Sequence, residues 1–127
     1  MTAGWTVHKL ETMAREKMIA GIERRYLSGA QTTLAQIFFP KGALVPQHTH
    51  PNEQVSFIVT GAVRFTLGGA EVVDVGAGEV LVIPPNVPHS AEALEETYDL
   101  DFFSPRREDW ISGNDAYLRA AADPVPR

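Results

Sequence analysis

The sequence predicts an all-β domain, a sandwich or a barrel of about eight strands. The chain has 127 residues, which is the size of one ordinary domain with one hydrophobic core. Its composition, with 44% hydrophobic and 21% charged residues, is close to the average of soluble globular proteins. Between residues 21 and 103, short β-prone runs are separated by Gly and Pro, a pattern typical of strands joined by tight turns.

The expected strands are β-prone runs, most of which end at a turn signal. The pair Gly68-Gly69 gives the strongest hairpin signal, because two glycines supply the positive φ values of a type I′ turn. This hairpin joins the fourth expected strand to the fifth. In order, the expected strands are Ile22–Leu27, Thr32–Phe39, Gln54–Thr60, Ala62–Leu67, Glu71–Val75, Val80–Ile83, Ser90–Ala93 and Thr97–Phe103.

Helix is expected only near the chain ends. Residues 115–121 form a candidate C-terminal helix capped by Asn114, short enough to need packing against the rest of the domain. Residues 1–17 contain no uninterrupted apolar run, so we expect no secretory signal peptide and a cytoplasmic location. No stretch approaches the roughly 20 apolar residues that a membrane span needs.

Charge and cysteine content exclude several partners and kinds of site. Lys and Arg number 11 against 16 Asp and Glu, a net charge of −5, so nucleic acid and anionic membranes are not expected partners. The chain has no cysteine, so it forms neither disulfides nor thiolate metal sites. Any metal ion must be held by nitrogen and oxygen ligands.

Three of the four histidines have the spacing of metal ligands. His48 and His50 are two residues apart, and the alternation of an extended chain places both imidazoles on one face. Gln54 has the same parity and Glu53 the opposite one, so a regular strand brings Gln54 into the site. A bulge at Pro51-Asn52 would reverse this parity and bring in Glu53 instead.

His89 follows a rigid segment with three prolines, residues 84–88, which would hold the histidine at the start of the next strand. Three imidazoles and one amide oxygen leave coordination positions open on a divalent ion, as a catalytic site requires. Iron, nickel, manganese, zinc and copper all accept these ligands, so the metal's identity stays open. Because this shell is neutral, the ion keeps its full charge and favours an anionic oxygen ligand.

These residues resemble the two motifs of the cupin superfamily. The histidines and the glutamine lie inside the motifs at the expected spacings, although many members have Glu where this chain has Gln54. The first motif runs from Gly42 through His48-Thr49-His50 and Gln54 to Gly61, and the second runs from Gly78 through Pro84-Pro85-Asn86 to His89.

The resemblance implies the fold and the position of the site. It implies a double-stranded β-helix, the cupin jelly-roll barrel, with one divalent metal ion at the barrel mouth. It also usually implies a homodimer. Residues 1–127 would then form one cupin domain, with the barrel at about 21–104, an N-terminal extension over 1–20 and a C-terminal tail over 105–127.

A second polar cluster follows the last expected strand. On pattern alone, Asp99 and Asp101 would line a solvated strand face, because an unpaired carboxylate inside an apolar strand is costly. However, the ending Asp-x-Phe-Ser-Pro-x-Arg-x-Asp, which begins at Asp101, resembles the KdgF family of small cupins. That family ketonises 4,5-unsaturated monouronates from pectin and alginate breakdown. The resemblance implies that Asp101 transfers protons and that Arg107 binds the substrate carboxylate.

The chemistry of ketonisation agrees with these residue types. Ring opening of an unsaturated uronate releases an aldehyde and an enol, and a proton must then reach carbon. Asp101 would serve as general acid and base, with a Lewis-acid metal beside it. We therefore expect a metal-dependent isomerase with a small anionic substrate. Two rivals stay open: another cupin metalloenzyme, such as a dioxygenase, and a non-catalytic cupin that binds a sugar or a small acid.

Overall fold

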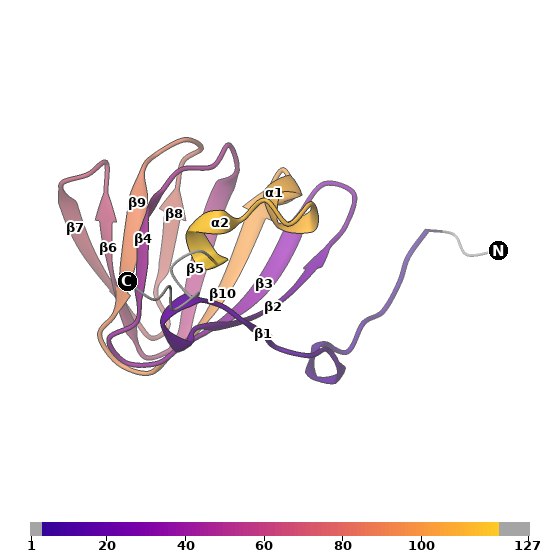
Figure 1. Ribbon diagram of the computed structural model, residues 1–127, viewed down its shortest axis with the longest axis horizontal. Coiled ribbons are helices and arrows are strands. Elements are labelled where there is room, and N and C mark those ends of the chain that lie inside the picture. The colour runs from indigo at the N-terminus through magenta and orange to yellow at the C-terminus, as the bar shows by residue number, and fades with distance from the viewer. Residues whose placement is uncertain (1–3, 120–127) are drawn as a thin grey trace, which may run out of the picture.

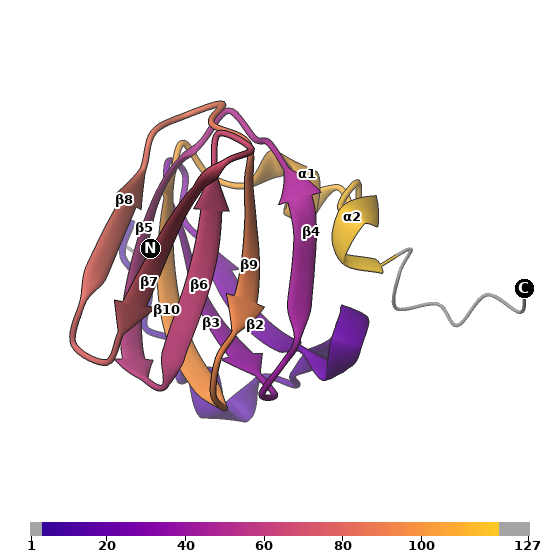
Figure 2. The same cartoon turned by 90° about the vertical axis from the view of Figure 1, so that its left-hand side faces the viewer.

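Two antiparallel sheets face each other and form a jelly roll (Figures 1 and 2). The structure is a computed structural model that describes residues 4–119. One sheet has six strands in the order β1-β2-β3-β10-β5-β8, and the other has four in the order β4-β9-β6-β7. From β3 onward the chain crosses repeatedly between the sheets, which is the jelly-roll arrangement. The expected all-β fold is confirmed.

The elements are short, and most connections between them are tight. The strands of the first sheet are β1 Glu16–Lys17, β2 Glu23–Ser28, β3 Thr33–Phe39, β10 Thr97–Ser104, β5 Glu53–Thr60 and β8 Val80–Ile83. Those of the second are β4 Leu44–His48, β9 His89–Ala93, β6 Ala62–Leu67 and β7 Glu71–Gly76. The helical segments are η1 Leu10–Thr12, η2 Ile19–Gly21, α1 Glu108–Ile111 and α2 Ala116–Arg119. Among the described residues, no helix has the length and apolar character to cross a membrane.

The hairpin between β6 and β7 is the one that Gly68-Gly69 predicts. Leu67 pairs with Glu71, and φ is 61° at Gly68 and 84° at Gly69, values that other residues rarely adopt. The Ala70 N–H donates to the Leu67 carbonyl at 3.2 Å, which closes the turn.

Several features differ from the sequence expectation, among them the two-residue strand β1, which the sequence does not predict. β4 has no clear strand signal because Pro46 interrupts it, and its pairing with β9 shifts register between Val45 and His48. α1 is a single turn, too short to show helical periodicity. The C-terminal helix begins at Ala116 instead of residue 115, and its expected end at residue 121 lies outside the described residues.

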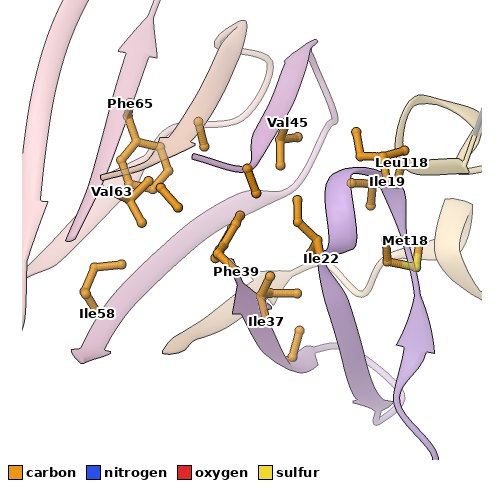
Figure 3. Close-up of a cluster of buried hydrophobic side chains, with 14 of the residues drawn as sticks. Met18, Ile19, Ile22, Ile37, Phe39, Val45, Ile58, Val63, Phe65 and Leu118 are labelled. Carbon is orange, nitrogen blue, oxygen red and sulfur yellow. The ribbon is translucent and has the colours of Figure 1, made fainter. Parts of the chain in front are cut away.

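Side chains that face inward change from apolar to polar along the strands. Apolar side chains from both sheets pack together in the core, among them Ile37, Phe39, Ile58, Val63 and Phe65 (Figure 3). Along β5 every second residue is buried, so Gln54, Ser56 and Ile58 all face inward. Ile58 joins the core, whereas Gln54 and Ser56 lie toward the other end of the strand. The functional site lies at the end of β5 that carries Gln54 and Ser56.

Candidate metal centre

Three histidines meet at one end of the jelly roll. His48 is the last residue of β4, His50 follows it in the loop, and His89 is the first residue of β9. The pairing of β4 with β9 places His48 directly opposite His89. One ring nitrogen of each histidine lies within 4.8 Å of those of the other two, so the three side chains can bind one metal ion.

Backbone carbonyls fix the same tautomer for all three rings. Each Nδ1 lies close to a carbonyl oxygen two residues away, and a carbonyl oxygen only accepts, so Nδ1 carries the hydrogen. The lone pair therefore resides on Nε2, as in many metal-ligating histidines. The accepting carbonyls are those of Pro46 for His48, Asn52 for His50 and Val87 for His89, at 2.8, 3.1 and 2.8 Å.

The lone pairs on Nε2 lack ordinary hydrogen-bond partners. His89 Nε2 is buried and has no partner among the described residues. His50 Nε2 lies 3.1 Å from Gln54 Oε1, so two acceptor atoms face each other in this tautomer. A buried lone pair without a partner and two acceptor atoms that face each other are both costly, and both become favourable beside a cation. The donor set therefore fits a divalent metal held by His48, His50, His89 and Gln54.

The orientation of the Gln54 amide follows from a chain of hydrogen bonds. Its Nε2 donates to Ser56 Oγ at 2.9 Å, and the Ser56 hydroxyl hydrogen-bonds to Asp101 on the neighbouring strand. This order of donors turns Gln54 Oε1 toward the histidines. Gln54 is buried, whereas Glu53 is exposed, so no bulge reverses the parity. The sequence does not single out Ser56, because its role depends on the register between β5 and β10.

The histidines are uncharged at neutral pH. Burial lowers the pKa of His48 to about 3 and the pKa of His50 to about 4, with further lowering by neighbouring positive groups. Burial also lowers the pKa of His89. A neutral imidazole is the form that binds a metal, so no proton has to be displaced at pH 7.

Two carboxyl groups point into the space beside the histidines. Asp99 and Asp101 are only 2% and 6% exposed, so the solvated strand face that the pattern alone favoured is wrong. Burial raises the pKa of both groups, and the Asp101 charge raises the pKa of Asp99 further. Asp99 therefore binds a proton more tightly than a free aspartic acid does, and its side chain hydrogen-bonds to that of Asp101. The shared parity of the two residues is the sequence signal that points to Asp99.

Arg107 lies in the same cavity wall and is 1% exposed. Its Nε and Nη2 donate to the two carboxylate oxygens of Asp109 at 2.9 and 2.8 Å, and Nη2 also donates to the Tyr117 hydroxyl at 2.9 Å. Its guanidinium carbon lies 4.7 Å from the Phe103 ring centroid and 4.4 Å from that of Trp110. Among the described residues, Nη1 has no hydrogen-bond partner and is the donor left for a ligand.

One cavity joins the metal centre, the acid pair and Arg107. Its volume is about 60 Å³. Its polar lining comes from His48, Gln54, His89, Asp99, Asp101, Arg107 and Tyr117, and its apolar lining from Ile37, Phe39, Val45, Phe65, Ala91, Phe103 and Trp110. A small ligand in this cavity lies against acid, cation and metal ligands at once, with apolar walls that limit the access of water.

A match to a protein family identifies the family of this chain. Residues 36–104 match the cupin domain, which is more than half of the chain. The chain belongs to the cupin family. Both cupin motifs, and with them all three histidines, fall within or overlap the matched range. The fold, the three-histidine group and the family together support a metal-dependent cupin function.

Solved structures of small cupins resemble this cupin over most of its length. KdgF from Halomonas sp. is 28% identical with a TM-score of 0.76, and the match covers 84% of this chain and 98% of that protein. An RmlC-like cupin from Shewanella frigidimarina is 32% identical with a TM-score of 0.73, over 79% of this chain and 90% of that protein.

A curated relative matches a shorter part of the chain. Dimethylsulfoniopropionate lyase DddQ from Ruegeria pomeroyi is 31% identical over 68 residues, which is 54% of this chain. The match covers 32% of the lyase, so this cupin spans about a third of the length of that relative.

Proposed function

We propose that this cupin is a metal-dependent isomerase that ketonises 4,5-unsaturated monouronates. The observation that carries the proposal is the buried Asp99–Asp101 pair, which opens into the same cavity as His48 and His89. Such a pair is an acid and base in one place, and ketonisation needs both. The similarity to KdgF from Halomonas sp., over nearly the whole of that protein, supports the same function.

His48, His50, His89 and Gln54 are the residues that would hold the metal. A divalent ion bound there supplies a positive charge that stabilises negative charge developing on a substrate oxygen. All four ligands are neutral, so they do not cancel this charge. The side chains of His48, His89 and Gln54 also line the substrate cavity and thereby influence which end of a substrate faces the acid pair.

Asp101 handles the proton at both stages of the reaction. It first accepts the proton of the anomeric hydroxyl, while the bond between the anomeric carbon and the ring oxygen breaks. An aldehyde forms, and the ring oxygen becomes an enolate oxygen. The acid pair then returns one proton to the adjacent alkene carbon, and the enolate becomes a ketone. The pair starts and ends with one proton, so substrate and product are isomers.

Arg107 is the cation that would bind the substrate carboxylate. Asp109 holds its guanidinium in place by two hydrogen bonds, so little conformational freedom is lost when a substrate binds. The contacts of the guanidinium with the rings of Phe103 and Trp110 restrict it further. A fixed positive charge in a buried cavity attracts an anionic sugar more strongly than the same charge at the surface.

A direct assay is to incubate the protein, loaded separately with each candidate metal, with 4,5-unsaturated galacturonate and follow the ultraviolet absorbance of its conjugated double bond. The proposal predicts loss of absorbance well above the spontaneous rate, and return to that rate with a chelator. Asp101→Asn should lower kcat by about 10²–10⁴-fold with the metal still bound. Asp74→Asn, at an exposed residue paired with Arg64, is the matched control and should stay active.

Three further measurements on the metal-loaded protein separate the rival functions. Oxygen uptake that accompanies turnover would point to a dioxygenase, since ketonisation involves no net redox change. Release of dimethyl sulfide from dimethylsulfoniopropionate would favour a lyase, the activity in the name of the curated relative. A metal-loaded protein that binds the uronate but shows only the spontaneous rate would favour a binding protein and contradict the isomerase.

A further inference from the structure

The segment after β10 folds back across the site. α2 packs beside β4, the strand that carries His48, and Leu118 of α2 is buried in the core (Figure 2). Tyr117 precedes Leu118 and faces the cavity. Its ring stacks on the His48 imidazole, with ring centroids 4.2 Å apart and planes inclined by 17°. A residue near the C-terminus therefore covers the metal centre.

The Tyr117 hydroxyl accepts hydrogen bonds from two groups that can only donate. Arg107 Nη2 lies 2.9 Å from the hydroxyl oxygen, and Trp110 Nε1 lies 3.4 Å from it. Within residues 4–119, no acceptor for the hydroxyl's own hydrogen is present among these contacts. The hydroxyl thus has one hydrogen to donate, at the wall of the cavity where Arg107 Nη1 also has no partner.

Arg107 alone is an incomplete carboxylate site. Asp109 occupies the side of the guanidinium that carries Nε and Nη2, which is the side best suited to a two-point contact with a carboxylate. A carboxylate that reaches Nη1 needs a second donor to satisfy its other oxygen. Tyr117 is joined to Arg107 by a direct hydrogen bond and is therefore close enough to supply that donor.

We propose that Tyr117 is a substrate-binding residue, which donates its phenolic hydrogen to the substrate carboxylate next to Arg107 Nη1. The identity of the ligand, a sugar carboxylate, rests on the proposed function. It assigns a role to the C-terminal segment, because α2 then completes the anion subsite as well as covering the metal centre. A uronate is selected over a neutral sugar by the same two donors.

The test compares Tyr117→Phe with Tyr26→Phe. The first keeps the ring stacked on His48 and removes only the hydroxyl. The second removes a hydroxyl that donates to the Trp110 carbonyl at 3.2 Å, away from the cavity lining. Metal content and thermal unfolding check that both variants fold and bind metal like the wild type. The probes are galacturonate and galactose, titrated by calorimetry into the metal-loaded proteins, together with KM and kcat for unsaturated galacturonate.

We expect Tyr117→Phe to weaken galacturonate binding by about 10- to 100-fold, the usual effect of losing a hydrogen bond to a charged group. KM should rise more than kcat falls, galactose affinity should not change, and Tyr26→Phe should match the wild type. Equal galacturonate affinity in the wild type and Tyr117→Phe, or no galacturonate binding by the wild type, would overturn the inference. Tyr117-dependent binding without turnover would support it and reject the isomerase instead.

Discussion

Asp99 and Asp101 differ in chemistry because their neighbours across the sheet differ. Asp99 is opposite Ile58 of the apolar core, and Asp101 is opposite Ser56, whose hydroxyl hydrogen-bonds to it and lowers its pKa. Ionisation is therefore more costly at Asp99 than at Asp101. Asp101 is left as the member of the pair that can accept a proton from a substrate.

Replacing Asp99 by Asn tests the raised pKa of this group. The raised pKa of Asp99 means that the folded state binds the proton more tightly than the unfolded chain does. This tighter proton binding stabilises the fold fully below pH 3.8, the pKa of the unfolded chain. The stabilisation declines as the pH rises toward the higher pKa of Asp99 in the folded state. Asn stays neutral, so Asp99→Asn should gain in unfolding free energy relative to wild type as the pH rises, by at most about 1.4 kcal/mol per pH unit.

Urea unfolding of the metal-free proteins between pH 4 and pH 8 measures this difference. Asp74→Asn is the control, because the pKa of exposed Asp74 is lowered by its hydrogen bond to Arg64 and should give no such gain. A difference between Asp99→Asn and wild type that does not change with pH would show that Asp99 has an ordinary pKa.

The grouping of the candidate metal ligands was predictable because it depends on local spacing. Period-2 alternation brings His48 and His50 together and includes Gln54, and the prolines before His89 mark a fixed position at the start of a strand. Asp109 and Tyr117 were not predictable in this way. Their contacts with Arg107 form only when the chain folds back after β10, and no periodic pattern encodes that turn.

At the scale of elements, a buried ion pair fastens the C-terminal segment. Arg24 of β2 and Asp115, the residue before α2, are both almost fully buried, and Arg24 Nη2 lies 3.0 Å from Asp115 Oδ2. Arg119 of α2 also contacts Asp115, at 2.6 Å, and Glu16 of β1 contacts Arg24 at 3.1 Å. This network joins β1, β2 and α2, and it holds Tyr117 over the site.

Without Asp115, the buried Arg24 guanidinium keeps only Glu16 as a charged partner, and the Glu16 side chain is 40% exposed. Asp115→Ala should therefore lower the free energy of unfolding by about 3–5 kcal/mol, as measured by chemical denaturation. The matched control is Asp74→Ala, which breaks the exposed pair with Arg64 and should leave the unfolding midpoint near that of the wild type. If both variants lose the same stability, the buried pair does not fasten α2.

The strands that follow strong local rules were predictable, and the others were not. Most predicted strands end at Gly, Pro or another turn residue, and the Gly68-Gly69 hairpin forms as expected. β4 lacked a signal because Pro46 interrupts it and a register shift separates Val45 from His48. α1 and α2 span four residues each in the described chain, so tertiary contacts, such as those of Trp110 and Leu118, determine them.

At the scale of the molecule, overall charge and site charge have opposite signs. The chain carries a net charge of −5, yet a metal ion held by neutral ligands would make the cavity positive beside Arg107, whose own charge is paired with Asp109. The jelly roll separates the two properties, because inward-facing residues are apolar at one end and form the site at the other. An acidic protein can therefore bind an anionic sugar, although its net charge gives no indication of this.

The most direct test of the central claim is the fate of the transferred proton. Unsaturated galacturonate is converted in deuterium oxide, and the new methylene group of the product is examined by NMR before it exchanges with solvent. An acid fixed in the cavity delivers deuterium to one face of the substrate, so the account predicts one of the two methylene positions to be labelled, with slow and unselective labelling in Asp101→Asn. Equal labelling of both positions by the metal-loaded wild type would contradict it.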